Sequence, residues 1–125
     1  RGRPGLGVML RHLKDGGTLA ALIDVRVNNG VPLPFLGQPA LTATSMAELA
    51  LCYGATLVPV YGIRSADAEH FTTYLDTAIP LTDPETMTRA LNTSLEARVR
   101  ENPEQWFWIH NRWKGGAMQG NMLDL

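Results

Sequence analysis

Hydrophobic residues recur at helical spacing in three stretches of the chain. The first stretch, residues 5–15, ends at two glycines, and the second, residues 43–53, ends at Gly54. The third runs over residues 82–101 and opens on Thr-Asp-Pro-Glu, a typical helix start. The apolar stripes are formed by Leu6, Met9, Leu10 and Leu13, then Met46, Leu49, Ala50 and Tyr53, then Met87, Leu91, Leu95 and Val99. The spacing predicts three amphipathic helices.

Apolar runs between these helices indicate strands. Residues 18–24 contain almost no polar side chain before Asp24, which is typical of a strand covered on both faces. Residues 56–61 predict a second buried strand, with a bulge or an edge at Pro59. Residues 70–75 are expected to pair back onto it in antiparallel fashion. This alternation of helices and strands predicts one α/β domain.

A long segment rich in glycine and proline, residues 25–39, follows the first predicted strand and is expected to be an irregular loop. Asp24 stands where the strand would emerge, and in open α/β sheets ligands bind at that end of a strand. A carboxylate there is costly to bury alone. We therefore expect Asp24 to meet an arginine, backbone amides or a ligand, and Arg26 is a candidate partner. A purely structural cap or ion pair that holds the loop is the alternative.

Composition narrows the class of protein further. The 125 residues are 45% hydrophobic and 18% charged, which is ordinary for a globular domain. The net charge of −1 gives no global field that favours nucleic acid. Cys52 is the single cysteine, so an internal disulfide is excluded. The chain begins Arg1-Gly-Arg-Pro without a methionine, and we expect it to be the C-terminal part of a longer protein.

Common motifs for nucleophiles, metals and phosphates are not found. The histidines, His12, His70 and His110, are far apart, and His110 is the most interesting because it lies in a tryptophan-rich segment, residues 104–114. Two interpretations of this segment are open. Its rings either close the domain core or form a patch at a membrane interface.

Two segments resemble the bacterial lipid A biosynthesis acyltransferases, the late lauroyl- or myristoyl-type enzymes within the lysophospholipid acyltransferase group. One reads Asp24-Val-Arg-(x)3-Gly30-Val-Pro-Leu-Pro-Phe-Leu-Gly-Gln-Pro-Ala40-x-Thr42, and the other Asn102-Pro-Glu-Gln-Trp-Phe-Trp-Ile-His-Asn-Arg-Trp-Lys114. Val58-Pro-Val60 falls where the family has Val-Pro-Val. The departures from the family pattern are Val25, Leu36 and Asn111, the last of which replaces a basic residue.

This resemblance implies the C-terminal part of a mixed-sheet α/β acyltransferase fold, with helices flanking the strands. Residues 1–114 are expected to belong to a single acyltransferase domain and residues 115–125 to a loose tail. The implied reaction is transfer of a fatty acyl chain from an acyl carrier protein thioester to a hydroxyl of a lipid A precursor, without a cofactor or a metal. The family's catalytic motif is His-x4-Asp, but five residues on from the three histidines stand Gly17, Leu75 and Gly115. No catalytic residue is therefore expected in this chain, and the motif is expected upstream.

The resemblance also suggests which residues bind substrate. Asp24 stands at the family's aspartate position and is expected to bind the acceptor or to position a basic residue. Arg26, Arg3, His110 and Arg112 are the further candidates, with Arg3 matching an arginine block that precedes the first helix.

Location and partners follow from the same resemblance. The protein is expected at the cytoplasmic face of the bacterial inner membrane, anchored by an upstream segment, with no nucleic acid partner. One rival is a related glycolipid or lysophospholipid acyltransferase that uses acyl-CoA. The other is a non-catalytic lipid-binding module whose contact surface is the tryptophan-rich segment.

Overall fold

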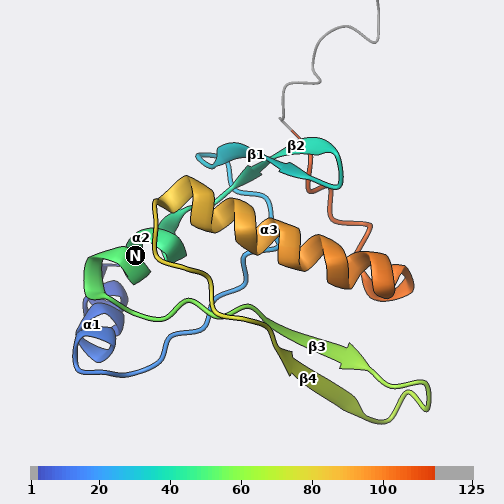
Figure 1. Cartoon of the computed structure of the whole chain (residues 1–125), viewed down its shortest axis with the longest axis horizontal. Coiled ribbons are helices and arrows are strands. Elements are labelled where there is room, and N and C mark those ends of the chain that lie inside the picture. The colour runs from blue at the N-terminus through green and yellow to red at the C-terminus, as the bar shows by residue number, and fades with distance from the viewer. Residues whose placement is uncertain (1–2, 115–125) are drawn as a thin grey trace, which may run out of the picture.

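The fold was obtained as a computed structural model, which describes residues 3–114 (Figure 1). It combines three helices with two antiparallel two-stranded sheets, so the α/β class is confirmed. The predicted tail, residues 115–125, lies outside the described residues. In chain order the elements are α1 (Arg3–Lys14), β1 (Val31–Phe35), β2 (Gln38–Thr42), α2 (Ser45–Tyr53), β3 (Val60–Arg64), β4 (Phe71–Leu75), α3 (Pro84–Glu101) and the 3-10 turn η1 (Pro103–Gln105).

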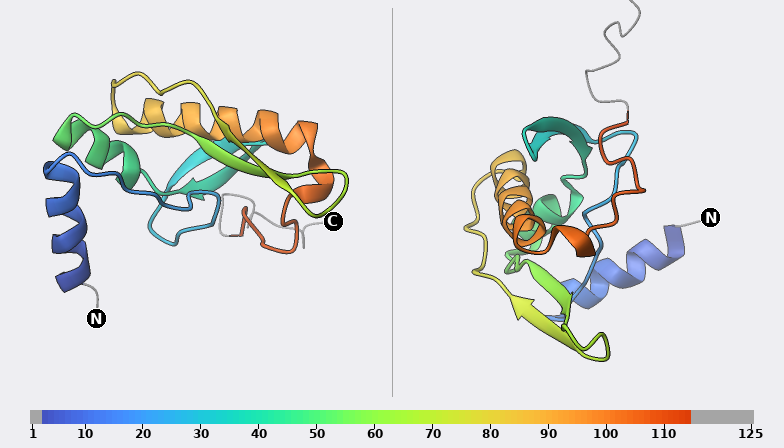
Figure 2. Two further views of the ribbon diagram at one scale, coloured as in Figure 1. Left: turned by 90° about the horizontal axis from the view of Figure 1, so that it is seen from below. Right: turned by 90° about the vertical axis from the view of Figure 1, so that its right-hand side faces the viewer.

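Helix α3 is the central element. It lies between the β1–β2 hairpin on one side and the β3–β4 hairpin on the other, while α2 packs near its start (Figures 1 and 2). The four-residue spacing predicted for α3 is confirmed, because Met87, Leu91, Leu95 and Val99 are all buried. Helix α1 stands away from α3 in both figures, and its residues Leu6 and Met9 are exposed.

Local signals account for the ends of the helices. The Asp83 side chain accepts a hydrogen bond from the backbone N–H of Thr86 at 2.9 Å, so it caps α3. Gly54 closes α2 in the left-handed region, with φ of 62°. All three predicted helices are confirmed. They were predictable because the contacts that end a helix lie within a few residues of the sequence signals.

The predicted buried strand at residues 18–24 is wrong. The segment is not part of any strand, and Leu22 is 84% exposed. A strand of this composition is stable only when neighbouring strands satisfy its backbone and other layers cover its faces. Within residues 3–114 neither sheet includes it. The apolar run signals a preference for burial, and that preference is not met by the described residues.

The predicted irregular loop is also wrong over its second half, which forms the β1–β2 hairpin. Strand β1 pairs antiparallel with β2, with Phe35 opposite Gln38 beside the turn. In such a hairpin the pair beside a two-residue turn is hydrogen-bonded, and the pairs then alternate. Each proline therefore falls in a pair that needs no N–H donor. The prolines concerned are Pro32, Pro34 and Pro39.

Leu36 and Gly37 form the hairpin turn, and both have positive φ, 49° and 79°. Two such residues define a type I′ turn, whose twist matches that of the strands. The Leu36 N–H donates to the Glu96 carboxylate on α3 at 2.7 Å. On the same helix, Glu85 and Arg89, four residues apart, form an ion pair at 2.7 Å.

The second predicted strand is confirmed in part. Strand β3 begins only at Val60, and Leu57 makes a single bridge to Ile79. The interruption at Pro59 agrees with the predicted bulge or edge. Antiparallel pairing with β4 is confirmed, with Tyr61 opposite Tyr74. The predicted burial on both faces is wrong, because exposed and partly buried residues alternate along β3.

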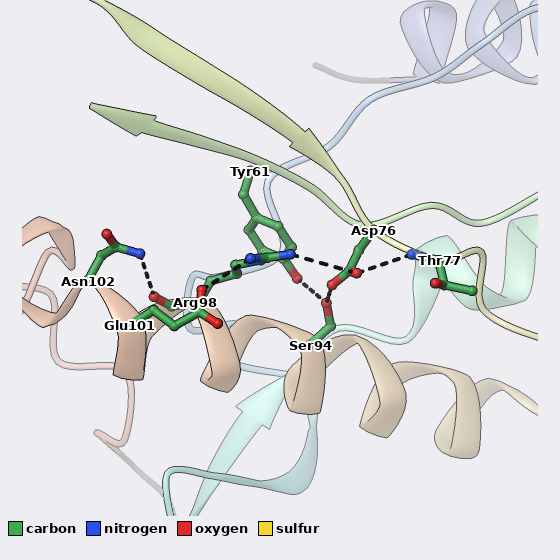
Figure 3. Close-up of polar contacts among 7 residues, drawn as sticks. All are labelled: Tyr61, Asp76, Thr77, Ser94, Arg98, Glu101 and Asn102. Carbon is green, nitrogen blue, oxygen red and sulfur yellow. Dashed lines mark hydrogen bonds and ion pairs between the residues drawn. The ribbon is translucent and has the colours of Figure 1, made fainter. Parts of the chain in front are cut away.

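A chain of polar contacts fastens the β3–β4 hairpin to α3 (Figure 3). The Tyr61 hydroxyl donates to Ser94 at 2.8 Å, and Ser94 donates to Asp76 at 2.7 Å. Because the carboxylate can only accept, the direction of both bonds is fixed. The Ser94 hydroxyl lowers the pKa of Asp76, while burial raises the pKa of Tyr61. The Arg98 guanidinium lies 5.8 Å from the Tyr61 ring centre and adds a cation–π contact.

The tryptophan-rich segment divides between the two interpretations. Trp106 and Trp113 pack on Phe35, with ring centres 5.6 and 5.8 Å away, and so close one core cluster. By contrast, Phe107, Trp108 and Ile109 are 67%, 52% and 87% exposed. Core closure therefore applies to the two flanking tryptophans and not to the residues between them.

Candidate functional site

The structure joins two segments that are 84 residues apart in the sequence. The backbone N–H of Arg26 donates to the His110 ring nitrogen Nε2 at 3.0 Å. The Arg26 guanidinium also donates to the backbone carbonyl of Lys114. The loop that follows Asp24 is thus bound directly to the C-terminal end of the tryptophan-rich segment.

His110 has a fixed hydrogen-bonding role here. Because Nε2 accepts the Arg26 N–H, the neutral ring carries its proton on Nδ1. A nitrogen occupied in this way does not take a proton from a substrate hydroxyl unless the contact breaks. The geometry favours a binding or positioning role for His110.

Arg112 lies inside the structure, with only 1% of its surface exposed. Its guanidinium donates to the Leu41 carbonyl at 2.6 Å and to the Thr42 hydroxyl at 2.8 Å, and it lies 5.8 Å from the Phe35 ring centre. Burial lowers the pKa of Arg112, and the negative charge of Asp24 opposes that effect. An arginine nevertheless stays protonated in proteins, so this buried side chain carries a full positive charge.

Glycine is required where the loop reaches the hairpin. A Cβ atom at Gly30 would stand 2.6 Å from the backbone nitrogen of Thr42. Real Cβ atoms essentially never come this close to another heavy atom, so any larger residue would force the backbone to shift. The loop therefore passes directly against β2, next to the contact of Arg112.

Asp24 is half-buried and borders a pocket of about 250 Å³. The pocket lies between residues 22–24, β3 and the last turns of α3. Its apolar lining comes from Leu22, Val60, Ile63, Leu95, Val99 and Trp106, with Arg98, Asn102 and Gln105 among its polar residues. An apolar pocket with a few polar groups at one side suits an amphiphilic ligand.

A larger groove of about 460 Å³ lies beside Trp108 and Trp113. Its lining includes one charged side chain, Arg100, and none of the predicted site residues. The smaller pocket is the better candidate site for two reasons. Asp24 borders it, and Arg26, two residues after Asp24, is hydrogen-bonded to His110.

Four of the predicted site residues are therefore brought into one region: Asp24, Arg26, His110 and Arg112. Arg3 is not among them, since it lies in the first turn of α1, which projects away from this region (Figure 2). Thr42 was missed as a partner of Arg112, although it is part of the first family-like segment. The Tyr61–Ser94–Asp76 contacts were also missed, and no motif in the sequence marks them.

Residues 3–114 contain no group of three or more His, Cys, Asp or Glu side chains placed to hold a metal ion. Among the helices of this described region, none has the length and hydropathy needed to cross a bilayer.

Comparison with known proteins gives a consistent result. A family model described as "Bacterial lipid A biosynthesis acyltransferase" matches residues 2–115. The chain is 34% identical over 119 residues to a lipid A biosynthesis lauroyltransferase of Escherichia coli (strain K12), covering 90% of the chain and 39% of that relative. It is 27% identical over 108 residues to a lipid A biosynthesis acyltransferase of Haemophilus influenzae (strain ATCC 51907 / DSM 11121 / KW20 / Rd), covering 84% of the chain and 34% of that relative. The chain thus spans less than two-fifths of the length of these relatives.

Proposed function

Because this chain belongs to the bacterial lipid A biosynthesis acyltransferase family, we propose that the complete protein transfers a fatty acyl chain to a hydroxyl of a lipid A precursor. The proposed donor is an acyl carrier protein thioester. The observation that carries the proposal for this chain is that Asp24 borders an apolar pocket, while Arg26, two residues on, is hydrogen-bonded to His110.

The proposed reaction forms one ester bond and breaks one thioester bond. The acceptor hydroxyl oxygen attacks the thioester carbonyl, the carbon–sulfur bond breaks, and the hydroxyl proton ends on the leaving thiol. None of the histidines in this chain has an aspartate five residues on. We therefore assign proton removal to a base outside these 125 residues and expect the isolated chain to be inactive.

This chain then contributes binding and orientation. The Asp24 carboxylate is placed to accept a hydrogen bond from a polar group of the acceptor, while the apolar pocket walls accommodate hydrocarbon. Holding the acceptor hydroxyl in line with the thioester converts an encounter between two molecules into a reaction within one complex.

The test is product analysis by mass spectrometry with the complete protein. We expect acylation of a lipid A precursor with acyl carrier protein as donor and little product with acyl-CoA. Acylation of a lysophospholipid from acyl-CoA, with no lipid A product, would instead establish the related acyltransferase. No acyl transfer to either acceptor would contradict the enzymatic proposal.

We further propose that residues 107–109 touch the cytoplasmic face of the bacterial inner membrane, where the acceptor lies. The supporting observation is that Phe107, Trp108 and Ile109 are consecutive, apolar and exposed. Aromatic residues are favoured at the boundary between lipid headgroups and hydrocarbon. The Trp108 indole N–H donates to the Pro103 carbonyl at 2.7 Å. Because its polar group is already hydrogen-bonded, the ring can enter an apolar layer without losing a hydrogen bond.

Liposome binding tests this contact. Changing both Phe107 and Ile109 to serine is expected to weaken sedimentation with anionic liposomes at least several-fold. Leu81→Ser is the control, because Leu81 is also exposed but precedes the opposite end of α3. Equal binding by wild type and the double variant would refute the contact. Strong binding together with no acyl transfer by the complete protein would favour the lipid-binding module.

A further inference from the structure

Residues 110–114 fasten two parts of the chain that do not otherwise belong to one element. On one side, His110 and the Lys114 carbonyl bind Arg26. On the other side, Arg112 binds β2 and the Trp113 indole N–H donates to the Phe35 carbonyl at 3.1 Å. Residues 110–114 therefore link the loop that carries Arg26 to the β1–β2 hairpin within five residues.

Arg112 is the most buried member of this group and makes its strongest contacts. Two of its guanidinium nitrogens are engaged by β2 at 2.6 and 2.8 Å, and a bond from a charged donor is about twice as strong as a neutral one. With 1% of its surface exposed, the side chain offers no face to a lipid phosphate. Substrate binding, which the sequence predicts for Arg112, is therefore not the role that its geometry favours.

The positive charge of Arg112 also relates it to Asp24. A buried guanidinium is stabilised by nearby negative charge, and the Asp24 carboxylate supplies such charge to Arg112 without a direct ion pair between the two side chains. Asp24 at the same time borders the pocket. One buried cation thus has its hydrogen bonds on β2 and its charge partner at the pocket edge.

We propose that Arg112 is a positioning residue, which holds the Asp24 carboxylate at the pocket edge by anchoring residues 110–114, and through them Arg26, to β2. The inference rests on the proposed function, since it explains how the acceptor-binding carboxylate is oriented. It assigns Arg112 no contact with substrate.

A double-mutant cycle in the complete protein tests the proposal. Arg112→Lys keeps the charge but cannot make both contacts with β2. We expect it to lower kcat for acyl transfer roughly 10-fold, and Arg112→Met to lower it roughly 100-fold. In an Asp24→Asn background, Arg112→Lys and Arg112→Met are each expected to change kcat by no more than about twofold. Arg89→Met, at an exposed arginine of α3, is the control and should leave kcat unchanged.

Additive losses of kcat in the double variants would overturn the proposal, as would normal kcat in Arg112→Met. If Arg112→Met shows no cooperative thermal transition, the cycle is decided by Arg112→Lys and by Thr42→Val, which removes one acceptor of the guanidinium. Wild-type protein without acyl transfer would refute the proposed function itself. Hydrogen exchange of the Arg26 amide then still tests the anchoring, since it should be faster in Arg112→Lys only if Arg112 holds this segment.

Discussion

Asp24→Asn is expected to lower acyl transfer by the complete protein roughly 100-fold, with most of the loss in kcat for the lipid acceptor. The substitution keeps the size of the side chain and one acceptor oxygen but removes the negative charge. The hydrocarbon part of the acceptor is still expected to bind in the apolar pocket. Its hydroxyl, however, is no longer oriented by a charged partner. Initial rates at varied acceptor concentration separate this effect from weaker binding.

The control for this experiment is Asp15→Asn. Asp15 is exposed just after α1 and does not line the pocket, so its replacement should not change the rate. Near-normal turnover by Asp24→Asn would return Asp24 to the structural alternative, a cap or an ion pair that only holds the loop. In that case the variant would show reduced thermal stability with an intact rate.

Phe35→Ala is expected to destabilise the fold by about 3–5 kcal/mol, the usual cost of deleting a fully buried aromatic ring. Phe35 is 0% exposed and contacts two tryptophan rings and the Arg112 guanidinium. Its removal leaves a cavity at the junction of the β1–β2 hairpin, α3 and the terminal segment. A loss of this size is comparable to the total stability of many domains, and urea unfolding followed by tryptophan fluorescence measures it.

Phe71→Ala provides the matched comparison, because the same ring is 70% exposed on β4. Its expected effect is within about 0.5 kcal/mol. If the two variants lost equal stability, the cluster around Phe35 would not be the core that the structure indicates.

Periodicity predicted the helices because a helix is determined by contacts within a few residues. The Asp83 cap and the buried stripe of α3 both follow from local spacing. The strand expected at residues 18–24 depended on neighbours that no local pattern can supply. Proline content concealed the β1–β2 hairpin, since it is the alternation of the prolines, and not their number, that decides whether a ladder forms.

The candidate site was predictable only through the family resemblance. Asp24 and His110 occur in the two family-like segments, but nothing in their spacing indicates that they meet. The burial of Arg112 was the least predictable feature of the site, because an arginine is usually solvent-exposed. Its burial results from a carbonyl, a hydroxyl and an aromatic ring supplied by residues about 70 positions earlier.

The Leu36–Gly37 turn has a consequence for the order of folding. A leucine in the left-handed region costs about 1–2 kcal/mol, so this turn does not form its hairpin readily on its own. The compensating hydrogen bond comes from Glu96, 60 residues later. We therefore expect the β1–β2 hairpin to become stable only together with α3, because its turn depends on a contact that closes this long loop. The scaffold of the candidate site is thus assembled late, after the helix on which it rests.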